Sequence, residues 1–206
     1  MKGAVYYGIE DVKIEERPKP TPGPKDVIVK NVCAGICGTD ISAYYHGGEP
    51  YGIKPNHIFG HEMAGYVVEV GSEVNDISVG MRCFVNPVTI KVPGSAPAIE
   101  IADMAGAFGE YVLVEEAKID YNIFPLPENV TFEEAAIIEP FNVGNRAVNN
   151  GHAKPGEKCV VYGAGPIGLC AVASLKGKGI KDIVVIDLNN RRLTVAKKMG
   201  CYTFNP

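Results

Sequence analysis

The sequence lacks three features that would set it apart from an ordinary globular protein. It has no excess of basic residues: its formal net charge is -4, whereas phosphate binding needs a basic face. It has no apolar run near the ~20 residues that a membrane-spanning helix needs. Its first residues, MKGAVYYGIEDVKIEE, do not place an apolar stretch after a basic one, so no signal peptide is expected. We therefore expect neither nucleic acid nor a membrane as a partner.

A disulfide framework is also missing. The 6 cysteines are scattered along the chain without paired spacings, which is typical of reduced and mostly buried thiols. Together with the absence of a signal peptide, this pattern predicts a cytoplasmic protein. At most one or two of these cysteines are expected to carry chemistry.

Short alternating segments fill most of the chain. Hydrophobic residues make up 46% of the sequence, and its 24 glycines and 15 prolines favour strands and turns over a helix bundle. Strands are predicted at residues 4–16 (a pair around Gly8), 26–37, 66–70, 79–88 and 108–119. Residues 89–107 have weak periodicity and are predicted to form a loop. Residues 131–150 are predicted to be helical, with Thr131 and Glu134 forming a capping box. Up to about residue 150, these segments predict a barrel-like all-β body with a few helices.

The pattern changes after the segment HAKPGEK. The apolar strands KCVVYGAG and KDIVVIDL alternate with the helical segments PIGLCAVASLKGKG and NNRRLTVAKKMG, and CYTFNP is expected to begin a third strand. Alternation of strand and helix predicts a parallel sheet with crossover helices. We place the boundary near Lys154, which divides the chain into domains 1–153 and 154–206.

A glycine fingerprint opens the second domain. Gly163, Gly165 and Gly168 form a G-x-G-x-x-G run between a predicted strand and a predicted helix. Asp187 ends the next strand about 20 residues further on, the context that dinucleotide binding requires. The first glycine permits a tight turn, the second lets the backbone approach a pyrophosphate, and the third lets the helix pack closely on the strand. The helix N-terminus attracts the phosphates.

The same region predicts which dinucleotide binds. Asp187 would accept hydrogen bonds from ribose hydroxyls and repel a 2′-phosphate, which favours NAD over NADP. Arg191 and Arg192 could instead hold such a phosphate, although one of them is expected to lie on a solvated helix face. A plain strand–helix–strand unit with a glycine turn is the alternative interpretation. The predicted cofactor residues are Gly163, Gly165, Pro166, Ile167, Gly168, Asp187 and Arg192.

The segment FGHEMAGYVVEVG places His61 and Glu62 side by side between glycines, downstream of the segment Cys37-Gly-Thr-Asp. These two segments, AFGEYVLV, IIEPFNVG and the glycine fingerprint occur in the order found in zinc-dependent medium-chain dehydrogenases/reductases of the alcohol and polyol type. The chain resembles that family over essentially its whole length. The resemblance implies a mixed β and α/β fold, in which a GroES-like β-barrel catalytic domain precedes the first part of a Rossmann domain.

The resemblance also implies a catalytic zinc, which takes about three protein ligands and leaves one position open. Cys37 and His61 are two ligands, and the third is Glu62 or Glu139, since the family varies here. In sorbitol-type members the glutamate of the GHE segment is a ligand, and the later glutamate holds the metal-bound water. We therefore expect Cys37, His61 and Glu62 as ligands, with Glu139 as a fourth or water-mediated contact. The glycines around the His–Glu pair would let the chain turn sharply enough to aim both side chains at one point.

A proton relay is implied as well. Thr39 would donate to the substrate oxygen and pass the alcohol proton outward. Ser42 stands where many members carry a histidine, so the relay would end in Ser42 and water or in His46. His46, His57 and His152 are otherwise expected to be surface or loop residues. The candidate pocket walls are Tyr44, Tyr45, Phe59 and Phe141.

Many members bind a second, structural zinc through four cysteines in the lobe that follows Cys83. From residue 84 to 158 this chain has no cysteine, so we expect no structural zinc. Relatives also continue well past the last residue, so the chain is expected to be C-terminally truncated, and a homo-oligomer when full length.

These features predict NAD-dependent oxidation of a small secondary alcohol, a polyol or diol, to a ketone. Two alternatives remain, a zinc-free quinone or enoyl reductase of the same superfamily and a non-catalytic zinc-binding fragment.

Overall fold

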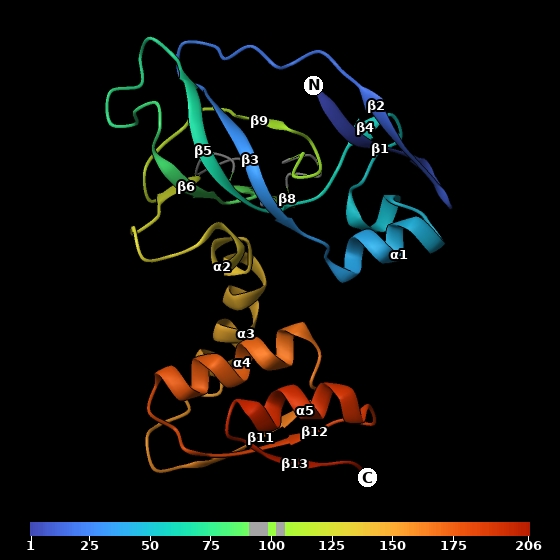
Figure 1. The fold of residues 1–206 in the computed structure, drawn as a ribbon, viewed down its shortest axis with the longest axis vertical. Coiled ribbons are helices and arrows are strands. Elements are labelled where there is room, and N and C mark those ends of the chain that lie inside the picture. Colours follow the sequence, from blue (N-terminus) through green and yellow to red (C-terminus); the bar gives the residue numbers. More distant parts are fainter. Residues whose placement is uncertain (91–98, 102–105) are drawn as a thin grey trace. The chain divides into compact units, whose positions relative to one another are not determined.

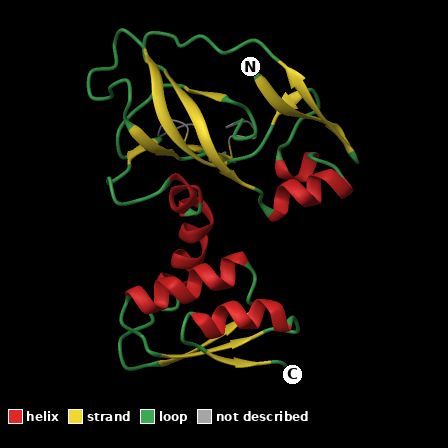
Figure 2. Cartoon of the chain, in the orientation of Figure 1, coloured by secondary structure: helices red, strands yellow, loops and turns green. Residues whose placement is uncertain are grey.

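The computed structural model describes residues 1–90, 99–101 and 106–206, which form two compact units, Met1–Ile137 and Ile138–Pro206. Strands dominate the first unit, whereas helices and strands alternate in the second (Figure 2). No helix in the described part of the chain combines the length and the apolar character needed to cross a membrane.

The units divide earlier than the boundary predicted near Lys154. Helix α3 (Ile138–Asn150) packs along α4 (Pro166–Gly177) and therefore belongs to the second unit. Gly144 makes this crossing close, because a Cβ there would lie 2.6 Å from the backbone nitrogen of Ala171. The sequence pattern changes at the first strand of the second unit, so it predicts the preceding helix but not that this helix packs with the second unit.

The first unit is built from antiparallel strands (Figure 1). One sheet has the order β10-β6-β5-β3-β9 and a smaller one the order β2-β1-β4. The larger sheet buries alternate apolar side chains such as Val27, Val29, Val112 and Val114 in one core, which accounts for the alternating sequence pattern. The strands are β1 (Lys2–Gly8), β2 (Asp11–Glu16), β3 (Val27–Gly35), β4 (His57–Ile58), β5 (Glu62–Val70), β6 (Arg82–Val85), β9 (Tyr111–Val114) and β10 (Ile123–Pro125).

The loop prediction for residues 89–107 is wrong at residues 89–90 and 99–101, which are strands, and holds at residues 106–107. Strands β7 (Val88–Ile90) and β8 (Ile99–Ile101) form an antiparallel pair in which Val88 faces Ile101 and Ile90 faces Ile99. β-branched residues favour extended backbone, but a segment of three residues is too short to show the period-two alternation that identifies a strand in the sequence. The rest of the predicted loop, 91–98 and 102–105, lies outside the described residues.

Helices occur at two positions in the first unit. Helix α1 (Gly38–His46) follows β3 and is succeeded by the short helix η1 (Glu49–Tyr51). Helix α2 (Phe132–Ala136) has the predicted capping box: Glu134 N–H donates to Thr131 Oγ1 (3.1 Å), and Thr131 N–H donates to Glu134 Oε2 (2.9 Å). The helix predicted over 131–150 is interrupted at Ile137, which is the C-cap residue of α2.

The second unit has the predicted order of strands and helices. Strands β11 (Lys158–Tyr162), β12 (Asp182–Ile186) and β13 (Tyr202–Phe204) are parallel and adjacent in that order. Helices α4 and α5 (Asn190–Lys198) cover one face of this sheet (Figure 1), as crossover connections of one hand require. Asn189 caps α5 by accepting from the N–H groups of Arg191 and Arg192.

Candidate metal and dinucleotide sites

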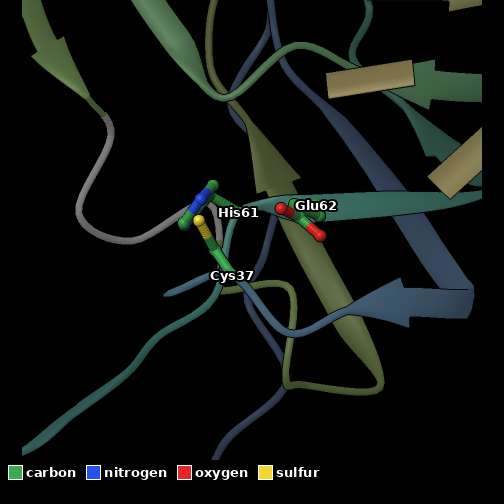
Figure 3. A group of neighbouring side chains, drawn as sticks. All are labelled: Cys37, His61 and Glu62. Carbon is green, nitrogen blue, oxygen red and sulfur yellow. The ribbon is translucent and has the colours of Figure 1, made fainter. Parts of the chain in front are cut away.

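Neighbouring strands bring three metal-ligating side chains together. Cys37 follows the end of β3 and is the N-cap residue of α1, while His61 and Glu62 stand at the start of β5. β3 and β5 are antiparallel partners, and Gly35 is paired directly with Glu62. Candidate ligand atoms of Cys37, His61 and Glu62 all lie within 4.8 Å of one another. Figure 3 shows the Cys37 sulfur beside the imidazole ring of His61, with Glu62 next to them at the start of β5.

Gly60 makes the sharp turn that the sequence indicates. Its φ is +89°, a left-handed conformation that disfavours other residues. A Cβ at this position would also lie 2.8 Å from the ring of Phe108. The turn places His61 immediately before β5, so that adjacent side chains reach one point.

The surroundings of Cys37 favour its thiolate. Its pKa is lowered chiefly by a hydrogen bond with His61, and further by hydrogen bonds from the side chain and backbone of Thr39, while partial burial opposes the shift. The thiolate is the form that binds metal, so the environment prepares this side chain as a ligand.

Asp40 is a buried residue that the sequence analysis did not assign to the site. Its side chain is 3% exposed, and its Oδ2 accepts a hydrogen bond from the backbone N–H of Cys37 at 2.8 Å. Its Oδ1 lies 3.8 Å from His61 Nδ1 and lacks a hydrogen-bond partner among the described atoms. Burial raises the pKa of Asp40, against the opposing effects of the Cys37 N–H and His61. The sequence feature that could have identified Asp40 is its position three residues after Cys37, the N-cap residue of α1, where an acidic side chain reaches back to the cap backbone.

These side chains fit a zinc ion. Sulfur, imidazole nitrogen and carboxylate oxygen are all zinc donors, and ligands of a tetrahedral zinc stand roughly 3.3–3.8 Å apart when its bonds are about 2.0–2.3 Å. Side-chain adjustments of about an ångström would therefore bring this set around one ion. The unpartnered Asp40 Oδ1 beside His61 supplies the carboxylate that commonly orients a ligating histidine.

The predicted relay residues lie on α1. Thr39 and Ser42 are both half-buried there, and Thr39 makes its hydrogen bonds to Cys37. His46, at the end of the helix, is exposed, as are His57 and His152. Glu139 is in the first turn of α3 in the second unit, so its contact with the metal stays a prediction.

Three of the four predicted pocket walls line one apolar pocket of the first unit. The pocket has a volume of about 840 Å³, and Tyr44, Tyr45 and Phe59 line it together with Asp40. Phe141, the fourth candidate, lies on α3 in the second unit.

The predicted cofactor residues line one groove of the second unit. The groove has a volume of about 730 Å³ and includes Gly163, Gly165, Pro166, Ile167, Gly168, Asp187 and Arg192. Gly163 has a φ of +97°, and a Cβ on Gly168 would lie 1.9 Å from the carbonyl oxygen of Gly163. A Cβ on Gly165, the N-cap residue of α4, would meet nothing within 4 Å. The first and third glycines thus serve the turn and the packing, while the second leaves open space at a helix N-terminus.

Asp187 holds this glycine turn. Its Oδ2 accepts from the N–H of Ala164 at 2.7 Å, and its Oδ1 accepts from the N–H of Asn189 at 2.6 Å. These two hydrogen bonds, and then the charge of Arg192, keep the pKa of the carboxyl below its ordinary value, so it is an anion at neutral pH. A carboxylate has about four acceptor positions, so this one retains capacity for ribose hydroxyls.

Comparisons with known proteins match both units. Residues 23–128 match the family model of the alcohol dehydrogenase GroES-like domain. The sorbitol dehydrogenase of Bacillus subtilis (strain 168) is 36% identical over 97% of this chain and 59% of its own length. The structure of 2R,3R-butanediol dehydrogenase from Bacillus subtilis superposes with a TM-score of 0.87 at 32% identity, over 100% of this chain and 63% of that one.

An alcohol dehydrogenase from E. coli CFT073, complexed with NADH, has a TM-score of 0.85 and 33% identity, over 100% of this chain and 62% of its own. The chain thus spans about 60% of the length of such relatives. The first unit has the GroES-like fold, and the second has the opening strands and helices of a Rossmann sheet. The chain therefore belongs to the zinc-dependent medium-chain dehydrogenase/reductase family, in its alcohol and polyol dehydrogenase branch.

Proposed function

We propose that this chain forms the zinc-binding and NAD-binding part of an enzyme that oxidises a small secondary alcohol, a polyol or diol, to a ketone. The observation that carries the proposal is the convergence of Cys37, His61 and Glu62 within 4.8 Å in the unit that matches the GroES-like domain. The names of the relatives, sorbitol and butanediol dehydrogenases, support the substrate class.

Cys37, His61 and Glu62 would hold the zinc, with Glu139 as a fourth or water-mediated contact. When bound, the zinc supplies a Lewis acid that lowers the pKa of a coordinated hydroxyl group. Cys37 would contribute a sulfur whose pKa His61 and Thr39 lower, which favours the thiolate form. Asp40 Oδ1 lies 3.8 Å from His61 Nδ1 and would orient the imidazole from that side, which would leave Nε2 for the metal.

Thr39 and Ser42 would move the proton. Oxidation of the alcohol to a ketone releases one proton from the hydroxyl oxygen and one hydride from carbon. Thr39 Oγ1 would accept the proton and pass its own to Ser42 and water, or to His46, along α1. Since Thr39 also donates to Cys37, its hydroxyl already lies beside the ligand set.

The groove of the second unit would bind NAD, whose nicotinamide accepts the hydride. The N–H groups at the start of α4 would face the pyrophosphate where Gly165 leaves space. Asp187 would accept from the adenosine ribose hydroxyls, and its negative charge disfavours a 2′-phosphate. The NADH complex of the E. coli relative supports NAD as the cofactor.

Metal analysis and turnover test the proposal together. We expect about one zinc per chain by elemental analysis, lost in Cys37→Ser, and NAD-dependent oxidation of sorbitol or butanediol. Zinc without turnover would favour a non-catalytic zinc-binding role. Turnover without zinc would favour a zinc-free reductase, and two zinc ions per chain would contradict the expected absence of a structural site.

A further inference from the structure

A glycine on the neighbouring strand leaves the space that the Glu62 carboxylate occupies. Gly35 ends β3 and is the direct cross-strand partner of Glu62 on β5. A Cβ built on Gly35 would lie 2.1 Å from Glu62 Oε2 and 3.2 Å from Glu62 Cβ. Real Cβ atoms do not approach an oxygen so closely, so any side chain at position 35 would displace this carboxylate.

The backbone itself does not demand glycine at this position. The φ of Gly35 is not positive, and the residue ends an in-register antiparallel run in which Cys33 and Ala34 occupy the two preceding positions of β3. The need for glycine therefore arises from the side chain opposite, which is 7% exposed and carries one of the three candidate ligand atoms.

We propose that Gly35 is a positioning residue of the metal site, which admits the Glu62 carboxylate to the point shared with Cys37 and His61. The inference rests on the proposed function, since it takes Glu62 as a metal ligand. Alanine at position 35 would turn the flexible carboxylate aside and leave the β3–β5 backbone in place. The metal site would lose affinity while the fold would lose little stability.

Gly65 on the same strand pair provides a matched control. A Cβ there would lie 2.1 Å from the carbonyl oxygen of Lys30, which is backbone and cannot turn aside. Gly65→Ala should therefore destabilise the fold without touching Glu62. Gly38→Ala is a second control beside Cys37, because a Cβ at position 38 meets nothing within 4 Å.

The test is a titration of the metal-free chain with Co²⁺, followed by thiolate-to-cobalt and d–d absorption. We expect Gly35→Ala to bind Co²⁺ at least about tenfold more weakly, the range seen when a ligand loses its orientation. Its metal-free melting temperature should change little, and Gly38→Ala should match the unsubstituted chain. Gly65→Ala should melt lower yet bind Co²⁺ normally when folded, and if it does not fold, Gly38→Ala remains as the control.

A double-mutant cycle separates positioning from general disturbance. In a Glu62→Ala background there is no carboxylate to displace, so adding Gly35→Ala should have no further effect on Co²⁺ affinity. An equal further loss in that background would overturn the positioning role. Normal affinity and spectrum in Gly35→Ala alone would also overturn it, while leaving the proposed function intact. Failure of the unsubstituted chain to bind Co²⁺ would overturn the proposed function and this inference together.

Discussion

At the residue scale, two cysteines of the first unit stand in opposite environments. His61 and Thr39 lower the pKa of Cys37, whereas burial alone raises the pKa of Cys83 to about 12. Thiolates react with alkylating agents and thiols do not. The first unit therefore contains one cysteine whose surroundings favour the thiolate and one buried cysteine whose surroundings favour the thiol.

Alkylation of the metal-free chain tests this difference. At neutral pH iodoacetamide should modify Cys37 well before Cys83, as peptide mass spectrometry would detect. His61→Ala removes the main cause of the lowered pKa, so the pH midpoint of Cys37 alkylation should rise. Thr39→Val should raise it less. Equal alkylation rates for Cys37 and Cys83 would contradict the assigned environments.

Asp187 gives a prediction for pH dependence. Its pKa is lowered in the folded chain, so its contribution to stability is present above the unfolded value of about 3.9 and is lost as pH falls through the folded value. Asp187→Asn should weaken the second unit at neutral pH and flatten its loss of stability below about pH 4. Urea denaturation between neutral and acid pH measures both effects, and Asp182→Asn, at an exposed strand position, is a control.

At the element scale, the glycine turn between β11 and α4 separates packing from binding. Gly168 stands against the Gly163 carbonyl at a distance that no side chain permits, whereas Gly165 borders open space. The same short motif therefore serves two purposes, and single alanine substitutions should distinguish them.

Gly168→Ala should destabilise the second unit by about 1–3 kcal/mol, the usual cost of an overpacked contact. Gly165→Ala should leave the stability nearly unchanged and weaken NADH binding, because its methyl group would occupy the space for the pyrophosphate. Thermal unfolding and NADH fluorescence titration would be measured on both variants. Loss of stability in Gly165→Ala would contradict the open space at that position.

At the scale of the whole molecule, each unit has its own core. One core gathers residues of the first unit, such as Val67, Met63 and Ile123, and the other gathers Ile183, Val185 and Leu193 of the second. The candidate ligands Cys37, His61 and Glu62 belong to the first unit, and the glycine groove belongs to the second. Ligands that contact only these residues should therefore stabilise the two units separately.

Calorimetry tests this separation. Zinc at about 100 times its dissociation constant should stabilise the first unit by about 2.7 kcal/mol, and Cys37→Ser should abolish this gain. NADH should raise only the transition of the second unit. A single transition that shifts equally with either ligand would contradict separate stabilisation.

Local patterns in the sequence were sufficient for features that depend on neighbours along the chain. The Thr131–Glu134 capping box, the strand–helix–strand–helix–strand order of the second unit and the turn at Gly60 are all confirmed. Caps, turns and alternation arise from backbone groups and side chains a few residues apart, so the sequence alone predicted them. The order of the motifs also identified the family.

The tertiary structure alone decided what depends on residues far apart in the chain. The β7–β8 pair, the packing of α3 into the second unit, the approach of Asp40 to His61 and the clearance that Gly35 leaves for Glu62 belong to this class. Each is set by which strand or helix lies alongside, and chain folding determines that choice through pairing and packing. A single sequence therefore named the candidate ligands, and only the fold showed what holds them in place.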